Sequence, residues 1–248
     1  ASDNKLISIT GIIGSHGLSF VTIYWIIVIS GLFKAKKFYA LCTSVFFPLT
    51  LFFITNSPEK NEVGKKVIVR IVQPNIPQEE KWDKKVINKN LNTLISLSNK
   101  NYQNQVPDII VWPESALTFF VNNDINLLSY LKKNLKKETL LVSGGLRKEV
   151  LNNEAKIFNS VFFIKNGKIL DYYDKKKLVP FGEYMPFRKY LTFKKLTDGN
   201  QDFSVGTKST YSEVFIKGQK IGLQTSICYE GVFSLRAPKK PDMIINIT

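Results

Sequence analysis

Histidine is almost absent from this sequence. Among 248 residues there is one, His16, and it lies in an apolar stretch near the start of the chain. Sites that pair a serine or cysteine with a histidine base need a histidine in the folded domain, and zinc sites need clustered histidines and cysteines. The composition therefore excludes a cysteine–histidine pair after residue 58, and we expect neither a bound metal nor a cofactor.

Cysteine is nearly as scarce. Cys42 lies in an apolar run, and Cys228 is the only cysteine in the more polar remainder of the chain. Two cysteines so placed predict no disulfide framework. A lone cysteine is more often a small buried residue than a reactive one. Cys228 therefore becomes a candidate nucleophile only if its surroundings support that role.

Acidic residues are also few, because Asp and Glu number 20 against 35 Lys and Arg, which gives a formal net charge of +15. A basic balance fits a nucleic acid, an anionic membrane surface or a lysine-rich exterior. The lysines are scattered, and no nucleic-acid-binding motif accompanies them. We therefore expect no nucleic-acid partner.

Two long apolar runs occupy the start of the chain, over residues 12–33 and 38–54. Each is long enough to cross about 30 Å of hydrocarbon as a helix, and a pair of buried core helices is the alternative. A short lysine-rich loop separates the runs, and such loops stay on the cytoplasmic side. We therefore predict a transmembrane segment over residues 1–57, followed by an extracytoplasmic domain over residues 58–248.

Beyond residue 58 the sequence alternates strand-like and helical patterns. In chain order we expect a strand at Val67–Val72, a helix at Trp82–Asn99, a strand at Asp108–Trp112, a helix at Asp124–Leu135, a strand at Thr139–Ser143 closed by two glycines, hairpins at Phe158–Tyr173 and Tyr211–Ile227, and a last strand at Asp242–Ile247. This order predicts an α/β fold in which helices cover a sheet. The chain stops directly after the last strand, which indicates a domain that is incomplete at its carboxyl end.

Three residues with complementary chemistry follow the ends of predicted strands: Glu114, Lys175 and Cys228. Ligand-binding and catalytic groups in open α/β folds gather at the carboxyl ends of strands. A thiolate nucleophile, a carboxylate base and an ammonium group that stabilises an oxyanion suffice for acyl transfer. A solvated carboxylate, a lysine of a surface run and a structural cysteine are the alternative interpretations of these three residues.

The motifs around these residues resemble those of a known superfamily. They read Trp-Pro-Glu-Ser at 112–115, Tyr-Asp-Lys-Lys-Lys-Leu-Val-Pro-Phe-Gly-Glu-Tyr at 173–184 and Ile-Cys-Tyr-Glu at 227–230. They are similar to the Glu-Lys-Cys motifs of the nitrilase, or carbon-nitrogen hydrolase, superfamily. The block at 178–183, together with Gln-Pro-Asn-Ile-Pro at 73–77 and Lys-Trp at 81–82, resembles the apolipoprotein N-acyltransferases within it.

The resemblance implies a nitrilase-like layered α-β-β-α sandwich preceded by a two-helix transmembrane hairpin. It implies an enzyme that moves an acyl chain from a phospholipid to the amino-terminal diacylglyceryl-cysteine of an apolipoprotein. The expected location is the bacterial inner membrane, as a multi-pass protein with its catalytic domain in the periplasm, and we expect a monomer. Because that family carries further segments on both sides, the chain resembles an internal piece of such an enzyme.

By motif position, the resemblance implies that Glu114 is the general base, Lys175 the oxyanion and positioning residue, and Cys228 the nucleophile. The supporting residues that it implies are Glu183, Tyr229, Glu230 and, more weakly, Asn159.

Two further functions stay open at this point. One is a membrane-anchored amidase of the same superfamily, with water as the acyl acceptor. The other is a non-catalytic membrane scaffold in which Cys228 is structural.

Overall fold

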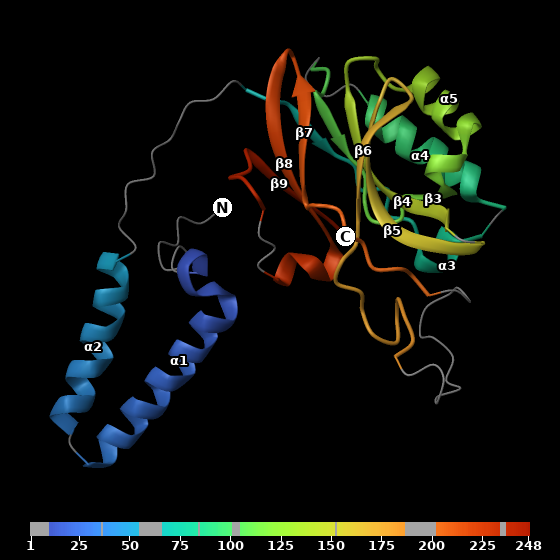
Figure 1. Cartoon of the computed structure of the whole chain (residues 1–248). Coiled ribbons are helices and arrows are strands. Elements are labelled where there is room, and N and C mark those ends of the chain that lie inside the picture. The colour runs from blue at the N-terminus through green and yellow to red at the C-terminus, as the bar shows by residue number, and fades with distance from the viewer. Residues whose placement is uncertain are drawn as a thin grey trace. The chain divides into compact units, whose positions relative to one another are not determined.

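The computed structural model describes residues 10–35, 37–54, 66–83, 85–100, 105–151, 153–186, 202–233 and 237–248. The chain divides into two compact units, Ala1–Lys65 and Lys66–Thr248 (Figure 1). The domain boundary predicted after residue 57 falls in 55–65, outside the described residues.

The first unit is a pair of helices, α1 (Thr10–Ala35) and α2 (Lys37–Ile54). They pack against each other, since Trp25 of α1 stacks on Phe47 of α2 at 5.6 Å between ring centroids and donates a hydrogen bond to the carbonyl of Thr43. The α1 backbone is interrupted at Gly14, which has a φ of 72°.

Both helices form where the apolar runs predict them, but the transmembrane hairpin expected from the sequence is not confirmed. Within the described ranges, no helix combines the length and the apolar character needed to cross a membrane. The 18 residues of α2 extend over about 27 Å at 1.5 Å per residue.

The second unit contains two β-sheets. The larger has the strand order β1-β2-β4-β5-β6, with β3 also pairing with β4. Strands β1, β2 and β4 are parallel, whereas β4, β5 and β6 form antiparallel hairpins. The bounds are β1 Val69–Ile71, β2 Ile109–Val111, β3 Leu117–Phe120, β4 Leu140–Leu151, β5 Glu154–Lys165 and β6 Lys168–Asp174.

The smaller sheet has the order β7-β8-β9, with bounds Tyr211–Ile216, Gln219–Ile227 and Met243–Ile247. Its β7 and β8 pair antiparallel, and β8 and β9 pair parallel. Buried side chains of both sheets share one core: Val142, Val161 and Phe163 from the larger sheet, and Leu223 and Ile245 from the smaller. The two sheets therefore pack face to face.

The other face of the larger sheet is covered by helices α4 (Ile87–Asn99) and α5 (Ile125–Asn134) (Figure 1). Leu94 and Leu131 from these helices share a second core with Trp112 and Leu141. The layer order is α-β-β, so the predicted α/β class is confirmed. The fourth, helical layer of the predicted sandwich is not found among the described residues.

Three sequence predictions about these elements can be compared directly. The hairpins predicted at 158–173 and 211–227 are confirmed, and their turns have left-handed φ values at Asn166 (49°) and Gly167 (68°) and again at Lys217 (50°) and Gly218 (75°). The predicted helix from Trp82 is wrong at its start. A short helix α3 (Gln78–Lys81) comes first, and α4 begins only at Ile87. Between them is a turn in which Asp83 accepts a hydrogen bond from the backbone N–H of Lys85.

The third prediction, that two glycines close the strand at 139–143, is also wrong. Strand β4 continues through Gly144 to Leu151 and pairs with β5 over its whole length. A Cβ at Gly144 would lie 2.6 Å from the carbonyl oxygen of Pro113. The glycine is therefore required by a close approach of two chain segments and not by a turn.

Candidate active site

Lys175 follows β6 directly, and its side chain is buried, with 2% of its surface exposed. Its Nζ lies 2.8 Å from Oε1 of Glu183, to which it donates a hydrogen bond, and 3.5 Å from Oε1 of Glu114. Its backbone N–H donates to the carbonyl of Asn159 on the neighbouring β5. The ammonium group is thereby fixed between two carboxylates.

Glu114 lies in the turn between β2 and β3, where Ser115 adopts a left-handed φ of 51°. Its Oε1 accepts a hydrogen bond of 2.7 Å from Nδ2 of Asn159, and the same Nδ2 lies 3.1 Å from Oε1 of Glu183. Asn159 therefore bridges the two carboxylates that flank Lys175, and it holds both at fixed positions.

Cys228 follows β8 directly and begins the short helix η3 (Cys228–Val232). Its φ of 50° is left-handed, a strained conformation for a residue other than glycine, and its side chain is partly exposed. Its carbonyl accepts a hydrogen bond from Nδ2 of Asn246 on β9. Cys228 lies close enough to Lys175 to contribute to the raised pKa of that ammonium group.

Glu230 is fully buried and connects the loop of Lys175 to the turn of Cys228. Its Oε1 accepts hydrogen bonds from the Tyr173 hydroxyl (2.9 Å) and from the backbone N–H groups of Lys176 (2.8 Å) and Lys177 (3.0 Å). Its Oε2 accepts from the backbone of Ile227 at 3.0 Å. The position of Glu230 beside Cys228 was expected from the sequence, but this connection between two loops was not.

Glu183 also stabilises its own loop, since its Oε2 accepts a hydrogen bond of 2.9 Å from the backbone of Val179. Tyr229 behaves differently from the other supporting residues. Its ring is half exposed and packs edge-to-face on Phe233 at 5.0 Å between centroids. The structure therefore brings Glu114, Lys175, Glu183 and Asn159 into direct contact, whereas the Tyr229 ring lies at the surface.

The protonation of Lys175 follows from these contacts. Burial alone would lower the pKa of its ammonium group, but the hydrogen bond that it donates to Glu183 and the electrostatic effect of Glu114, Glu183 and Cys228 outweigh burial and raise it. Lys175 is therefore positively charged at neutral pH. Burial and the neighbouring Glu230 raise the pKa of Tyr173, which keeps its hydroxyl as a hydrogen-bond donor.

Asp174, the residue before Lys175, is held by a buried network that the sequence did not indicate. Arg147 of β4 donates two hydrogen bonds of 2.9 Å to its carboxylate, and Ser160 of β5 donates one of 2.6 Å. The Arg147 guanidinium also lies 4.2 Å from the ring centroid of Phe158. Three strands therefore fix the backbone from which Lys175 projects.

Lys81, at the end of α3, is a second cation near the site. It interacts electrostatically with both Glu114 and Cys228, and it lines a cavity of about 240 Å³ together with Glu114. Lys81 belongs to the Lys-Trp motif at 81–82, but the sequence alone indicates no role for it. A position near the site could have been expected because Lys81 follows β1 in the chain. Strands β1 and β2 are parallel neighbours, so their carboxyl ends lie at the same edge of the sheet.

The sequence profile of the carbon-nitrogen hydrolases matches residues 68–238. The chain belongs to the carbon-nitrogen hydrolase family. Its cysteine, lysine and glutamate motifs, which resembled that superfamily, all lie within the matched range.

Two curated relatives match almost the whole chain. The chain is 34% identical over 258 residues to a protein of Rickettsia typhi named apolipoprotein N-acyltransferase, and 35% identical over 259 residues to the protein of the same name in Rickettsia prowazekii. Each match covers 98% of this chain and 49% of the relative. This carbon-nitrogen hydrolase chain thus spans about half the length of the curated relatives it matches.

Among solved structures, a carbon-nitrogen hydrolase superfamily protein of Xanthomonas campestris aligns with a TM-score of 0.44 and 16% sequence identity. The alignment covers 74% of this chain and 65% of that protein.

The arrangement contains the groups needed for nucleophilic acyl chemistry without histidine: a partly exposed thiol, a fixed ammonium group and two carboxylates. In the part of the chain that the structure describes, no group of three or more histidine, cysteine, aspartate or glutamate side chains could hold a metal ion.

Proposed function

We propose that this chain is the catalytic part of an acyltransferase that moves a fatty acyl chain from a phospholipid to the amino-terminal diacylglyceryl-cysteine of an apolipoprotein. The observation that carries the proposal is the buried Lys175 ammonium group held between Glu114 and Glu183 on the same site as Cys228. The name of the curated relatives, apolipoprotein N-acyltransferase, supports the choice of substrates.

In the first half-reaction, Glu114 accepts the proton of the Cys228 thiol, and the thiolate attacks the carbonyl carbon of a phospholipid ester. Lys175 stabilises the negative charge that develops on the carbonyl oxygen, together with the backbone N–H of Tyr229. The C–O bond to glycerol then breaks, Glu114 returns its proton to the leaving oxygen, and a lysophospholipid departs. The acyl chain remains on Cys228 as a thioester.

In the second half-reaction, the free amine of the diacylglyceryl-cysteine attacks the thioester. Glu114 takes a proton from the attacking nitrogen, the C–S bond breaks, and Cys228 regains a proton. The product is an amide, and the two half-reactions form a ping-pong scheme. Asn159 and Glu183 hold Glu114 and Lys175 at their positions in both steps. Glu230 holds the loops of Lys175 and Cys228 together.

We further propose that the protein works at the bacterial inner membrane, in a multi-pass enzyme, with its catalytic unit on the periplasmic side. The exposed apolar side chains of α1 and α2, such as Phe20 and Phe38 with about 70% of their surface exposed, support contact with lipid. The lysines around the α1–α2 turn, Lys34 and Lys37, favour a cytoplasmic position for that turn. The monomeric state stays a prediction.

The test is to detect the acyl-enzyme. The full chain is incubated in detergent with a phospholipid and analysed by mass spectrometry, alone and with a diacylglyceryl-cysteine peptide as acceptor. We expect an acyl mass on the peptide that contains Cys228, release of lysophospholipid, and transfer to the acceptor amine. Cys228→Ala is expected to show none of these.

The alternatives predict different products. Free fatty acid in place of N-acylated peptide would contradict the transferase and support an amidase-like use of water. An unchanged product yield with Cys228→Ala would indicate that this cysteine is structural.

A further inference from the structure

A half-buried cation lies beside the candidate nucleophile without a partner. Lys81 projects from α3, and its ammonium group forms no hydrogen bond or ion pair with the residues that the structure describes. Burial lowers its pKa, and only the charges of Glu114 and Cys228 act in the opposite direction. Burying a cation without such a partner costs free energy, and binding of an anionic ligand would offset that cost.

The cavity that Lys81 lines contains one positive and one negative side chain. Lys81 and Glu114 are its two charged residues, but Glu114 already has partners in Asn159 and Lys175. Of the two charged groups, Lys81 is therefore the one that has no hydrogen bond or ion pair with the described residues. The amide side chains of Gln73 and Asn75 also line this cavity of about 240 Å³ and provide neutral hydrogen-bond donors.

We propose that Lys81 and this cavity bind the phosphodiester group of the phospholipid donor, so that the adjacent acyl ester reaches Cys228. The inference rests on the function proposed above and adds the part of the donor that the site recognises. A phosphodiester is a compact anion with several acceptor oxygens, which suits one ammonium group and nearby amide donors. Apolar side chains such as Ile76 and Leu91 complete the cavity and suit the glycerol and first methylene groups.

The position of Lys81 supports a phosphodiester over a free carboxylate ligand. Lys81 is close enough to Cys228 for their charges to interact, and in a glycerophospholipid the phosphodiester and the acyl ester are a few bonds apart. A single donor molecule can therefore contact Lys81 with its phosphodiester and present its ester to the thiolate.

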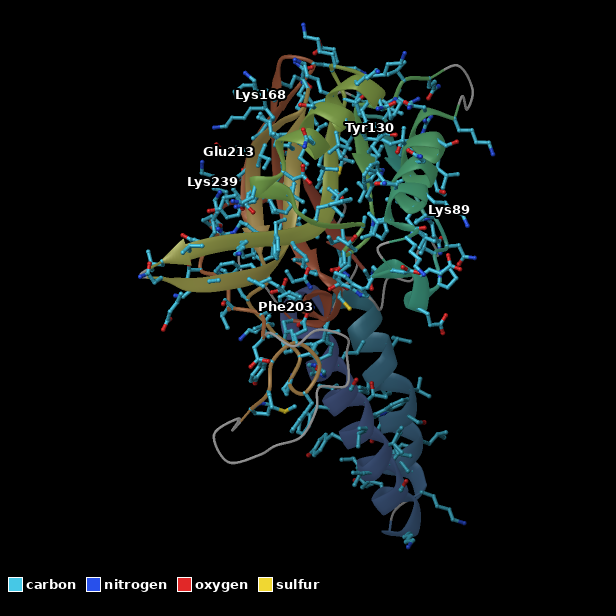
Figure 2. All side chains as sticks on the ribbon, turned by 90° about the vertical axis from the view of Figure 1, so that its right-hand side faces the viewer. Lys89, Tyr130, Lys168, Phe203, Glu213 and Lys239 are labelled. Carbon is cyan, nitrogen blue, oxygen red and sulfur yellow. The ribbon has the colours of Figure 1, made fainter. Side chains whose placement is uncertain are left out.

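The experiment compares donors within one variant. The acylation rate of Cys228 in the full chain is measured by intact mass with three donors: a phospholipid, a diacylglycerol with the same acyl chains, and a p-nitrophenyl ester. The variants are Lys81→Met, Lys81→Arg and, as a matched control, Lys89→Met. Lys89 is exposed on α4 and lies at the outer surface of the helix (Figure 2).

We expect Lys81→Met to reduce the ratio of phospholipid to diacylglycerol acylation by about tenfold or more, the size of a lost charge-assisted hydrogen bond. Lys81→Arg should retain most of the ratio, and Lys89→Met should match the unchanged protein. Because the ratio is taken within one variant, a smaller folded fraction does not change it.

An equal loss with all three donors would show that Lys81 acts on the thiolate, and it would overturn the inference. An unchanged ratio in Lys81→Met would overturn it as well. If the unchanged protein is acylated by the p-nitrophenyl ester but by neither lipid, the proposed function fails and this inference fails with it. The first two results leave the proposed function intact.

Discussion

At the scale of single residues, the most informative group is the ammonium of Lys175. A buried lysine without partners releases its proton more easily than one in water. Here the hydrogen bond to Glu183 and the electrostatic effect of Glu114, Glu183 and Cys228 outweigh burial, so the folded pKa lies above the ordinary value. The stabilisation is complete below the pKa of an unfolded lysine and is lost as pH rises through the folded pKa.

Glu183→Gln removes the negative charge closest to Lys175, so that less remains to offset the lowering of the Lys175 pKa by burial. We expect the Lys175 pKa to fall, so that the alkaline decline of Cys228 acylation moves to lower pH. The acylation rate at neutral pH should also fall by about tenfold or more, because a charge-assisted hydrogen bond is lost. The measurement is the pH dependence of the acylation rate with a phospholipid donor.

A matched control exists at the surface. Glu138→Gln changes a carboxylate that is 83% exposed and 3.9 Å from Lys165, and it should leave the pH profile unchanged because such pairs contribute little. If Glu183→Gln kept the alkaline limit of the unchanged protein, Glu183 would not control the protonation of Lys175.

At the scale of elements, the turn that carries Glu114 is positioned by its contact with β4. A Cβ on Gly144 would lie 2.6 Å from the Ser115 nitrogen and 2.7 Å from the Glu114 Cα, distances that real Cβ atoms do not show. Gly144→Ala should therefore displace Glu114 and reduce Cys228 acylation by about a hundredfold, the usual effect of a displacement of about 1 Å in an active site.

The measurement is the acylation rate together with thermal unfolding. Gly31→Ala is the control, because a Cβ there has no neighbour within 4 Å. The overpacking at Gly144 should cost about 1–3 kcal/mol of stability and leave the protein folded. Full activity in Gly144→Ala would mean that the Glu114 turn moves without consequence.

The strand β6 depends on the buried pair of Arg147 and Asp174. Asp174→Asn would leave the Arg147 guanidinium without its buried counter-charge, which should lower the free energy of unfolding by about 3–5 kcal/mol. Denaturant unfolding measures this. Asp171→Asn on the same strand is the control, since Asp171 pairs with the more exposed Lys208 and should change stability by less than about 1 kcal/mol. Equal effects of the two substitutions would contradict a special role for the buried pair.

These elements also show how far the sequence alone could reach. Strand ends and glycine-containing turns are local patterns, so the sequence predicted both hairpins and the positions of Glu114, Lys175 and Cys228 after strands. The Arg147–Asp174 pair joins residues 27 apart in sequence, and Glu230 contacts a backbone more than 50 residues away. Such contacts depend on which strands become neighbours, and no local pattern contains that information.

The structural role of a glycine could not be predicted from the sequence for the same reason. Gly144 looked like the end of a strand because glycine favours turns, yet its function is to let the Glu114 turn approach β4. Only the tertiary contact distinguishes these two uses. Lys81 was likewise visible as a motif residue, but only the folded chain shows that it has no hydrogen bond or ion pair with the described residues and that its charge acts on Cys228.

At the scale of the whole molecule, the order of strands and helices was sufficient to predict an α/β fold, because layered sheets and helices follow from that order. The core between the two sheets confirms this. The transmembrane prediction started from the length of two apolar runs, and among the described residues no helix is both long and apolar enough to cross a membrane.

The net charge of +15 leads to a last prediction at this scale. Some of the lysines are paired, as Figure 2 shows for Lys239 beside Glu213, at 3.0 Å, but the excess remains. We expect the full chain to bind vesicles that contain phosphatidylglycerol more tightly than phosphatidylcholine vesicles at about 0.05 M salt. Raising the salt to about 1 M shortens the Debye length to about 3 Å and should remove this preference.

Cosedimentation with each vesicle at both salt concentrations measures the two contributions separately. Binding that persists at high salt is expected for both lipids, because exposed apolar side chains of α1 and α2, such as Ile23 and Phe46, are not screened by ions. Equal binding to both lipids at low salt would show that the positive charge does not direct the chain to anionic surfaces. Complete release from both at high salt would show that the apolar helices do not enter lipid, and the membrane location proposed for the enzyme would then depend on charge alone.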